Sequence, residues 1–347
     1  MFSAISDRYL LAAVVVGVVA VGLTLAIGLV ILGLRLYGRR DDLRWQAFVA
    51  QWRPLLLAAV LSQGPLELPG LARRDHGRFL RLWTYLHESV RGDATNRLNQ
   101  AALALGMDHS ARRLLQRGTR AQQLQAILAA GYLKDKTAWG TLQGMAASRD
   151  GLLSVNAARA LIRIDPLEGA QYLTPLILAR HDWDVTRVAA FLVDAREAFR
   201  LLIRNIPVMA ARELPRALAL ADALRLQLPP ATLRHLLHQG QPAAIVRNAL
   251  RLTTATELAD EVRACLSHAV PVVRVEAALA LARIGGPQDV PRLTALLEDA
   301  KWPVRLGAAQ ALSSLPFLST PQLVSLQREG FAANDVLRHV VAEREWA

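Results

Sequence analysis

The sequence repeats one helical pattern at a nearly constant interval, and this repetition limits the fold more than any other feature. Residues 273–281 read VRVEAALAL, and residues 304–312, which lie 31 positions later, read VRLGAAQAL. Apolar residues return at helical spacing, and the paired alanines form a surface that another helix can approach closely. The apolar stripe of such a unit cannot be buried within the unit, so neighbouring units must stack. The pattern therefore predicts an array of stacked helical repeats.

Earlier parts of the chain carry the same frame of an apolar residue, two alanines and a second apolar residue. One copy comprises Leu153, Ala157, Ala158 and Leu161, and another, 32 residues later, comprises Val185, Ala189, Ala190 and Val193. Weaker copies surround Ala126 and Ala249. The segment 207–241 fits the frame poorly, so the sequence leaves open the number of repeats between residues 200 and 245.

Each copy is expected to contain two helices. In the copy that begins near Val273, the first helix ends at Ile284, glycines and a proline at 285–287 break it, and a second helix continues to about Glu298. Composition agrees, because 53% of the residues are hydrophobic and only 5% are aromatic, so alanine and leucine dominate over strand-favouring residues. Residues 254–257 match a capping box, and Thr320 is expected to cap a helix that begins with Pro321.

These repeats resemble the HEAT-repeat family, specifically the short variety of about 30 residues shared with phycobilisome-lyase-like repeats. The residues that carry the resemblance are Val273, Arg274, Ala277, Ala278 and Leu281, and Val304, Arg305, Ala308, Ala309 and Leu312. The resemblance covers residues 118–347 and implies an all-α fold, an α-α superhelix whose faces bind proteins. In this family such arginines commonly pair between repeats, which implies a structural role for Arg274 and Arg305. Ser154 and Thr186 depart from the family, which often has arginine there.

A long apolar run precedes the repeats. Tyr9–Leu34 carries no charge and as a helix would extend roughly 39 Å, beyond a bilayer core of roughly 30 Å. A signal peptide would need a shorter apolar region and a basic leader, whereas the leader here offers only Asp7 and Arg8. We therefore predict a single transmembrane helix over residues 9–36, preceded by a short non-cytoplasmic tail over residues 1–8.

Positive charges after this run predict its orientation. Cytoplasmic flanks of membrane helices are enriched in arginine and lysine, which places the N-terminus outside and the repeats in the cytoplasm, at a bacterial inner membrane. Residues 37–70 are predicted to form an amphipathic helix and a linker, and residues 71–117 a helical capping region. Tryptophans in this amphipathic helix either lie at the lipid headgroups or pack on the soluble core, and both interpretations stay open. The residues predicted at the membrane interface are Arg35, Arg39, Arg40, Arg44, Trp45 and Trp52.

No familiar catalytic or phosphate-binding motif occurs in the sequence. Cys265, the only cysteine, lies among apolar residues and is expected to be a small buried hydrophobe. His235 and His238 have helical spacing but no further zinc ligand in view. We therefore predict no catalytic residue, no metal site and no cofactor.

Two polar clusters have structural interpretations. Asp184, close to His181 and Asp182, falls where one repeat turns into the next and is expected to cap a helix. Asp75 and His76 follow two arginines in a segment that we expect to be a solvated linker.

The net charge of +12 fits several partners. We favour a non-enzymatic, membrane-anchored scaffold that binds a protein partner, for instance as an accessory subunit of an envelope complex such as a polysaccharide-synthesising glycosyltransferase. A nucleic-acid-binding protein is the first alternative, although the anchor and the few aromatic residues argue against it. A bilin-lyase-like enzyme is the second alternative, and it rests on the repeat type alone. Partner identity, binding face and oligomeric state stay open.

Overall fold

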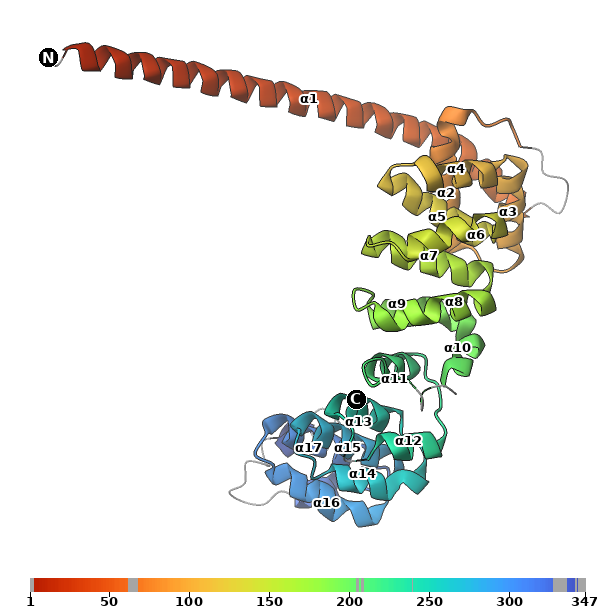
Figure 1. Ribbon diagram of the computed structural model, residues 1–347, viewed down its shortest axis with the longest axis vertical. Helices are drawn as coiled ribbons and strands as arrows, with labels where there is room; N and C mark the ends of the chain where they lie inside the picture. The colour runs from red at the N-terminus through yellow and green to blue at the C-terminus, as the bar shows by residue number, and fades with distance from the viewer. Residues whose placement is uncertain are drawn as a thin grey trace. The chain divides into compact units, whose positions relative to one another are not determined.

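The computed structural model describes residues 3–61, 68–203, 206, 209–238, 240–326, 336–340 and 342. Side chains are described at these positions except 3–13, 33, 34, 36–38, 40, 194 and 201–203. The described residues form helices and turns and contain no strand, which confirms the predicted all-α class (Figure 1). The chain divides into two compact units, Met1–Asp135 and Lys136–Ala347.

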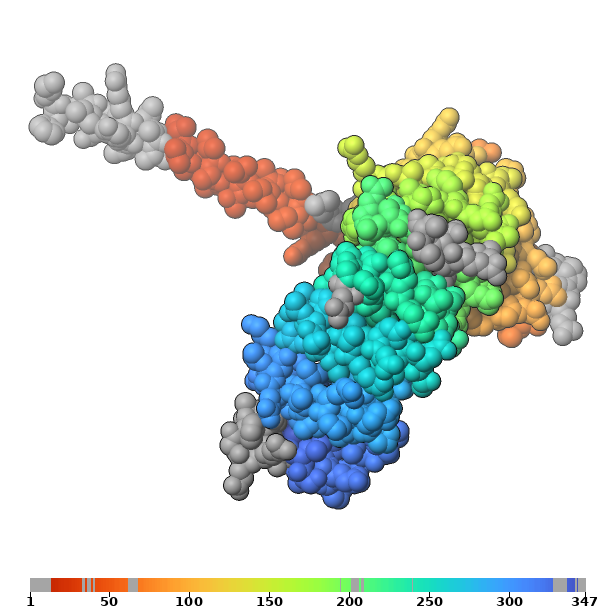
Figure 2. Space-filling view, turned by 60° about the horizontal axis from the view of Figure 1, so that its bottom comes forward, coloured from red at the N-terminus to blue at the C-terminus, as the bar shows by residue number. Residues whose placement is uncertain are grey.

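The first unit begins with one long helix, α1 (Ser3–Leu61), which includes Pro54. Its stretch Val14–Leu32 has a mean hydropathy of 2.9 and none of it is buried by the protein. Figure 2 shows this stretch projecting uncovered from the packed part of its unit. By length and composition it is able to cross a membrane. The same helix then continues, without a break, through the segment that the sequence predicted as a separate amphipathic helix.

The C-terminal part of α1 belongs to the core of the first unit. Phe48, Trp52, Leu56 and Ala59 are buried at helical spacing and face α2 and α3. Trp52 meets Phe79 edge to face, with 5.4 Å between ring centroids. The remaining elements of this unit are η1 (Arg73–Asp75), α2 (His76–Ser89), α3 (Asp93–Ala104), α4 (Met107–Arg117) and α5 (Arg120–Leu133).

The unit boundary lies later than the start of the predicted repeat array. Helix α5 packs on α2 and α4 and so belongs to the first compact unit, which ends at Asp135. Trp83 is fully buried among these helices and donates its indole N–H to the carbonyl of Leu98 at 2.8 Å. The weak repeat copy around Ala126 is therefore part of the first unit.

The second unit consists of helix pairs. Its first helices are α7 (Gly151–Ile164), α9 (Val185–Leu192), α11 (Leu214–Ala223), α13 (Ala243–Leu252), α15 (Pro271–Ile284) and α17 (Trp302–Ser314). Its second helices are α8 (Pro166–Ala179), α10 (Arg196–Ile203), α12 (Pro230–Leu236), α14 (Ala259–Cys265), α16 (Val290–Ala295) and α18 (Thr320–Ser325), and α6 (Trp139–Ala146) precedes the series. Short 3-10 helices adjoin several of them: η2 (Lys136–Ala138), η3 (Val193–Ala195), η5 (Thr256–Leu258), η6 (Pro287–Asp289) and η7 (Leu296–Glu298).

Each first helix contacts the next along the series from α7 to α17, which is the predicted solenoid arrangement (Figure 1). The segment 207–241, which fits the repeat frame poorly, contains α11 and α12, and α11 contacts both α9 and α13. The stacking thus continues through the part of the array where the sequence left the repeat number open.

Small residues bring the first helices together. Ala277, Ala278, Ala308 and Ala309 are fully buried. At Gly307 a Cβ atom would lie 3.0 Å from the Val275 side chain, so the close approach of α15 and α17 leaves little room for a side chain at this position. The copy at 185–193 departs from the frame: α9 ends at Leu192, before Val193, and both Ala190 and Val193 are exposed.

Arginines tie neighbouring repeats to one another. Arg274 binds both carboxylate oxygens of Asp299, at 2.8 and 2.9 Å, which confirms its predicted inter-repeat role. Arg263 binds the fully buried carboxylate of Asp289 in the same bidentate way, at 2.6 and 3.0 Å. Bidentate pairs of this kind are directional as well as strong, so they fix the spacing of successive helices.

Two predicted helix caps are wrong in detail. Residues 254–257 form no capping box: the N-cap of η5 is Ala255, which has no side-chain acceptor. Helix α18 is capped by Ser319 rather than by Thr320, through a capping box with Gln322. In both cases the helix begins one residue away from the expected position.

The buried Arg263–Asp289 pair generates a test of stability. We expect Asp289→Asn to destabilise the fold by about 3 kcal/mol, because it leaves the Arg263 guanidinium without its buried partner. The hydrogen bond from Arg263 lowers the pKa of Asp289, so the pair's contribution is present at neutral pH and is lost as the pH falls through that lowered pKa.

The matched control is Asp260→Asn, which removes the second carboxylate bound to Arg263, at 2.6 Å, but from a side chain that is 90% exposed. We expect this variant to lie within about 0.5 kcal/mol of the parent. Thermal unfolding of the full-length protein, followed by circular dichroism, compares the two. Equal losses would contradict the assignment of Asp289 as the structural partner.

Candidate functional site

The arginines predicted at the membrane interface lie on α1 just after its apolar stretch. Arg35, Arg39 and Arg44 are exposed, and the side chain of Arg40 lies outside the described residues. Arg44 also lines a crevice of about 490 Å³ in the first unit, together with Phe48, Arg74, Asp75 and Arg78. The C-terminal side of the apolar stretch is therefore bordered by exposed positive charge.

The two tryptophans predicted at the interface lie in different environments. Trp45 is half-buried, stacks on Phe48 with 6.4 Å between centroids and is covered by the guanidinium of Arg81 at 4.5 Å. Trp52 is only 3% exposed and packs against Phe79. Trp52 thus belongs to the core of the first unit rather than to the membrane-interface group, because α2 covers its ring.

The segment containing Asp75 and His76 is not the solvated linker that the sequence predicted. Asp75 ends η1 and His76 begins α2, where its Nδ1 lies 2.7 Å from the hydroxyl of Ser110. Arg78 binds Asp75 at 2.8 Å and Asp41 at 2.9 Å, and these hydrogen bonds, that with Asp41 foremost, raise the pKa of Arg78. These groups attach the start of α2 to α1 and α4.

The cluster near His181 has a structural role. Asp184 is the N-cap of α9 and accepts a hydrogen bond from the Arg187 amide at 2.9 Å, as predicted. Asp182 pairs with Arg180 at 2.6 Å, and the hydrogen bond from Arg180 lowers the pKa of Asp182. Arg180 also donates to the Ser148 carbonyl at 2.5 Å, so the cluster joins α6 to the turn before α9.

His235 and His238 do not share a helix face, because α12 ends at Leu236. The Nδ1 of His238 instead accepts a hydrogen bond from the Gly240 amide at 3.2 Å. Throughout the described ranges, no group of three or more histidine, cysteine or acidic side chains is placed to hold a metal ion.

A group of charges on the first helices of three successive repeats could not be found from the sequence. Glu276 on α15 is half-buried near Arg251 and Arg247 of α13, and Arg251 pairs with Asp222 of α11 at 3.0 Å. Burial raises the pKa of Glu276, and the nearby arginines offset this only in part. These residues lie on three different helices and form no sequence motif. Only the stacking of the helices brings them together.

With the geometry in place, one stretch of the chain has a counterpart among known families. Residues 230–313 match the family model of HEAT repeats. The match runs from α12 through most of α17, the part of the array that contains Arg274–Asp299 and Arg263–Asp289. HEAT repeats are helical-repeat scaffolds for protein interaction. No curated protein matches the chain.

The environment of Cys265 generates a test of reactivity. The thiol is 1% exposed, and burial raises its pKa to about 11. We expect the folded protein to resist a thiol reagent such as iodoacetamide at mildly alkaline pH, and the unfolded chain to react fully, because the thiolate is the nucleophile. Mass spectrometry of the labelled protein measures this. Rapid labelling of the folded protein would contradict the burial of Cys265.

The burial of Glu276 generates a test of pH dependence. Its raised pKa means that the folded protein holds the proton more tightly than the unfolded chain does. The stability it contributes is therefore present below the ordinary value of 4.5 and is lost as the pH rises through the folded-state pKa. We expect Glu276→Gln to melt at an equal or higher temperature than the parent at neutral pH. Glu298→Gln, which changes an exposed carboxylate, is the matched control and leaves the melting temperature unchanged.

Proposed function

We propose that this chain is a membrane-anchored scaffold, in which the Val14–Leu32 stretch of α1 crosses the bacterial inner membrane and the helical repeats bind a partner protein in the cytoplasm. The observation that carries the proposal is the continuity of α1. The Val14–Leu32 stretch exposes apolar side chains apart from Thr24, while Phe48, Trp52 and Leu56 further along the same helix build the core of the first unit. Exposed apolar surface of this extent needs a covering, and a bilayer provides one.

An uninterrupted helix also joins the membrane rigidly to the folded protein. Leu32 and Phe48 are separated by roughly 24 Å of helix at 1.5 Å per residue. The first unit would therefore be held close to the membrane surface, with no flexible linker between. A scaffold so held presents its partner-binding surface to proteins in or near the same membrane.

The distribution of arginines supports the cytoplasmic orientation. Arg35, Arg39 and Arg44 border the C-terminal end of the apolar stretch, whereas the N-terminal side has Arg8 beside Asp7. Cytoplasmic flanks are the ones enriched in such residues. The repeats would then lie in the cytoplasm and the N-terminus on the far side of the membrane.

A binding role is proposed in preference to catalysis or nucleic-acid binding. The polar clusters around Asp75, Asp184 and Arg274 are engaged in helix caps and pairs between elements. The arginines in these pairs are held by carboxylates of the protein itself and have structural roles, so they do not indicate a phosphate-binding surface. Neither an envelope complex nor a phycobilisome-lyase-like relationship has a supporting observation beyond the repeat type and the membrane segment.

The anchor generates a test by truncation. A chain that begins at Asp41 keeps Phe48, Trp52 and Leu56, so we expect it to fold, and the loss of Val14–Leu32 to move it from the membrane fraction to the soluble fraction. The matched control is full-length Val19→Ala, which alters the anchor without adding charge and stays in the membrane fraction. Fractionation of cells and circular dichroism of the purified truncated chain measure the two expectations.

Mass spectrometry of proteins that co-purify with the full-length chain in mild detergent tests the binding role. We expect one protein complex, recovered in a constant ratio to the tagged chain. Recovery of nucleic acid alone, or a truncated chain that remains in the membrane fraction after a carbonate wash, would contradict the proposal.

A further inference from the structure

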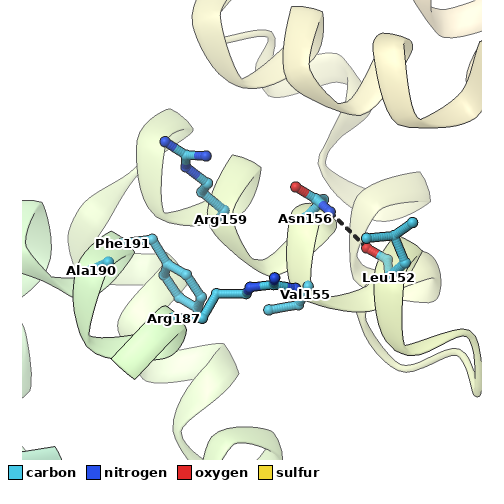
Figure 3. A pocket seen from close by; sticks show the side chains of 7 residues that line it. All are labelled: Leu152, Val155, Asn156, Arg159, Arg187, Ala190 and Phe191. Atoms are coloured by element: carbon cyan, nitrogen blue, oxygen red, sulfur yellow. Dashed lines mark hydrogen bonds between the residues drawn. The ribbon is translucent and has the colours of Figure 1, made fainter. Parts of the chain in front are cut away.

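A groove of about 370 Å³ lies between two first helices of the second unit, α7 and α9. The residues that line it are Leu152, Val155, Asn156, Arg159, Arg187, Ala190 and Phe191 (Figure 3). The groove lies at residues 185–193, the copy of the repeat that departs from the expected pattern of buried alanines. Ala190, which pattern alone would bury against the neighbouring helix, is instead exposed on the wall of the groove.

The floor of the groove is apolar. Val155 and Phe191 form it and are only 4% and 6% exposed, whereas Leu152 at the rim is 38% exposed. Because Ala190 has a short side chain, the groove is not filled from the side of α9. An apolar side chain that entered here would pack mainly on Leu152, with Val155 and Phe191 beneath it, and would lose its own contact with water.

The two charged side chains that line the groove are both positive. Arg159 of α7 and Arg187 of α9 have no carboxylate partner among the described residues, unlike Arg180, Arg263 and Arg274 of the same unit, which are all paired. Figure 3 shows the Arg187 side chain extending from α9 toward Val155 and Asn156 of α7, and the Arg159 side chain pointing in another direction. The two guanidinium groups therefore offer separate sets of donors to carboxylates.

Asn156 adds an acceptor. Its side-chain amide donates to the Leu152 carbonyl at 2.8 Å, which leaves the side-chain oxygen for a donor such as a peptide N–H (Figure 3). Two cationic donors, one acceptor and an apolar floor complement an acidic peptide that carries an apolar side chain. A single-stranded nucleic acid fits less well, because proteins that bind it stack successive bases on several aromatic rings and Phe191 is the one aromatic residue that lines the groove.

We propose that the groove between α7 and α9 is the docking site for an acidic segment of the partner protein, whose carboxylates bind Arg159 and Arg187 while an apolar side chain packs beside Leu152, above Val155 and Phe191. This inference rests on the proposed scaffold function and deepens it by naming the surface and the chemistry of what it binds. The carboxylates of the partner's acidic segment match the positive charges of Arg159 and Arg187, and the apolar contact fixes the position of that segment along the groove.

A peptide titration tests the docking site directly. The probe is a fluorescein-labelled peptide in which leucines are flanked by glutamates, and its control has glutamine at every glutamate. Fluorescence polarisation with the full-length protein in detergent micelles measures binding. We expect the acidic peptide to bind more tightly than its control, and Arg159→Gln and Arg187→Gln each to weaken binding about tenfold, the ratio that about 1.4 kcal/mol represents.

The matched control variant is Arg113→Gln, which removes an exposed arginine of α4 in the first unit and is expected to leave the affinity unchanged. A charge exchange separates a direct contact from a folding defect. The double variant Arg159→Glu with Arg187→Glu is expected to reject the acidic peptide and to bind a peptide with lysine at the glutamate positions. Circular dichroism of each variant verifies the fold.

The docking site would be overturned if the acidic peptide did not bind, if the glutamine peptide bound equally well, or if the two arginine substitutions had no effect. Stronger competition by a single-stranded oligonucleotide or by anionic lipid vesicles than by the acidic peptide would also overturn it.

Co-purification distinguishes failure of the docking site from failure of the scaffold role. If the parent recovers a partner and the double variant recovers it equally, the groove assignment is wrong and the scaffold stands. If the parent recovers none, the scaffold role itself fails.

Discussion

The close approach of successive first helices is the interaction on which the second unit depends. A single helix pair has too little apolar surface to remain folded alone, and each pair buries its stripe only against its neighbours. Alanines at 277, 278, 308 and 309 and the glycine at 307 permit this approach by keeping side chains small where backbones meet. Larger residues there would separate the helices and expose the leucines and valines beneath them.

Charge pairs then set the geometry that the apolar contacts leave free. Apolar packing is not directional, so stacked helices could slide or rotate with little cost. Arg263–Asp289 joins α14 to η6, and Arg274–Asp299 joins α15 to the turn before α17. Arg283 donates to the Leu250 carbonyl at 2.7 Å and so joins α15 to α13. Arginines thus serve the internal structure at several junctions of the array, whereas Arg159 and Arg187 have no carboxylate partner among the described residues.

Helix α1 combines two roles that the sequence presented as consecutive segments. Its apolar part and its core-forming part obey different patterns, the first apolar on every side and the second only on the face toward α2 and α3. Because one helix contains both the apolar part and the core-forming part, any contact that fixes the apolar part also positions the first unit. Trp52 illustrates the ambiguity, since a tryptophan near an apolar stretch suits both a headgroup layer and a packed core.

The sequence by itself determined the features that depend on local periodicity: the all-helical class, the apolar stretch, the repeated frame, the burial of Cys265 and the cap at Asp184. These follow from the spacing of residues along one helix or one turn, which a sequence displays directly. Only the tertiary structure decided which neighbour each side chain meets. The burial of Trp52 by α2, the completion of the array by α11 and α12, the position of Glu276 among arginines of other repeats and the groove at Ala190 all depend on how helices stack. Such contacts join residues that are far apart in the sequence, and their geometry is set by the angles and ends of helices rather than by the pattern within any one of them.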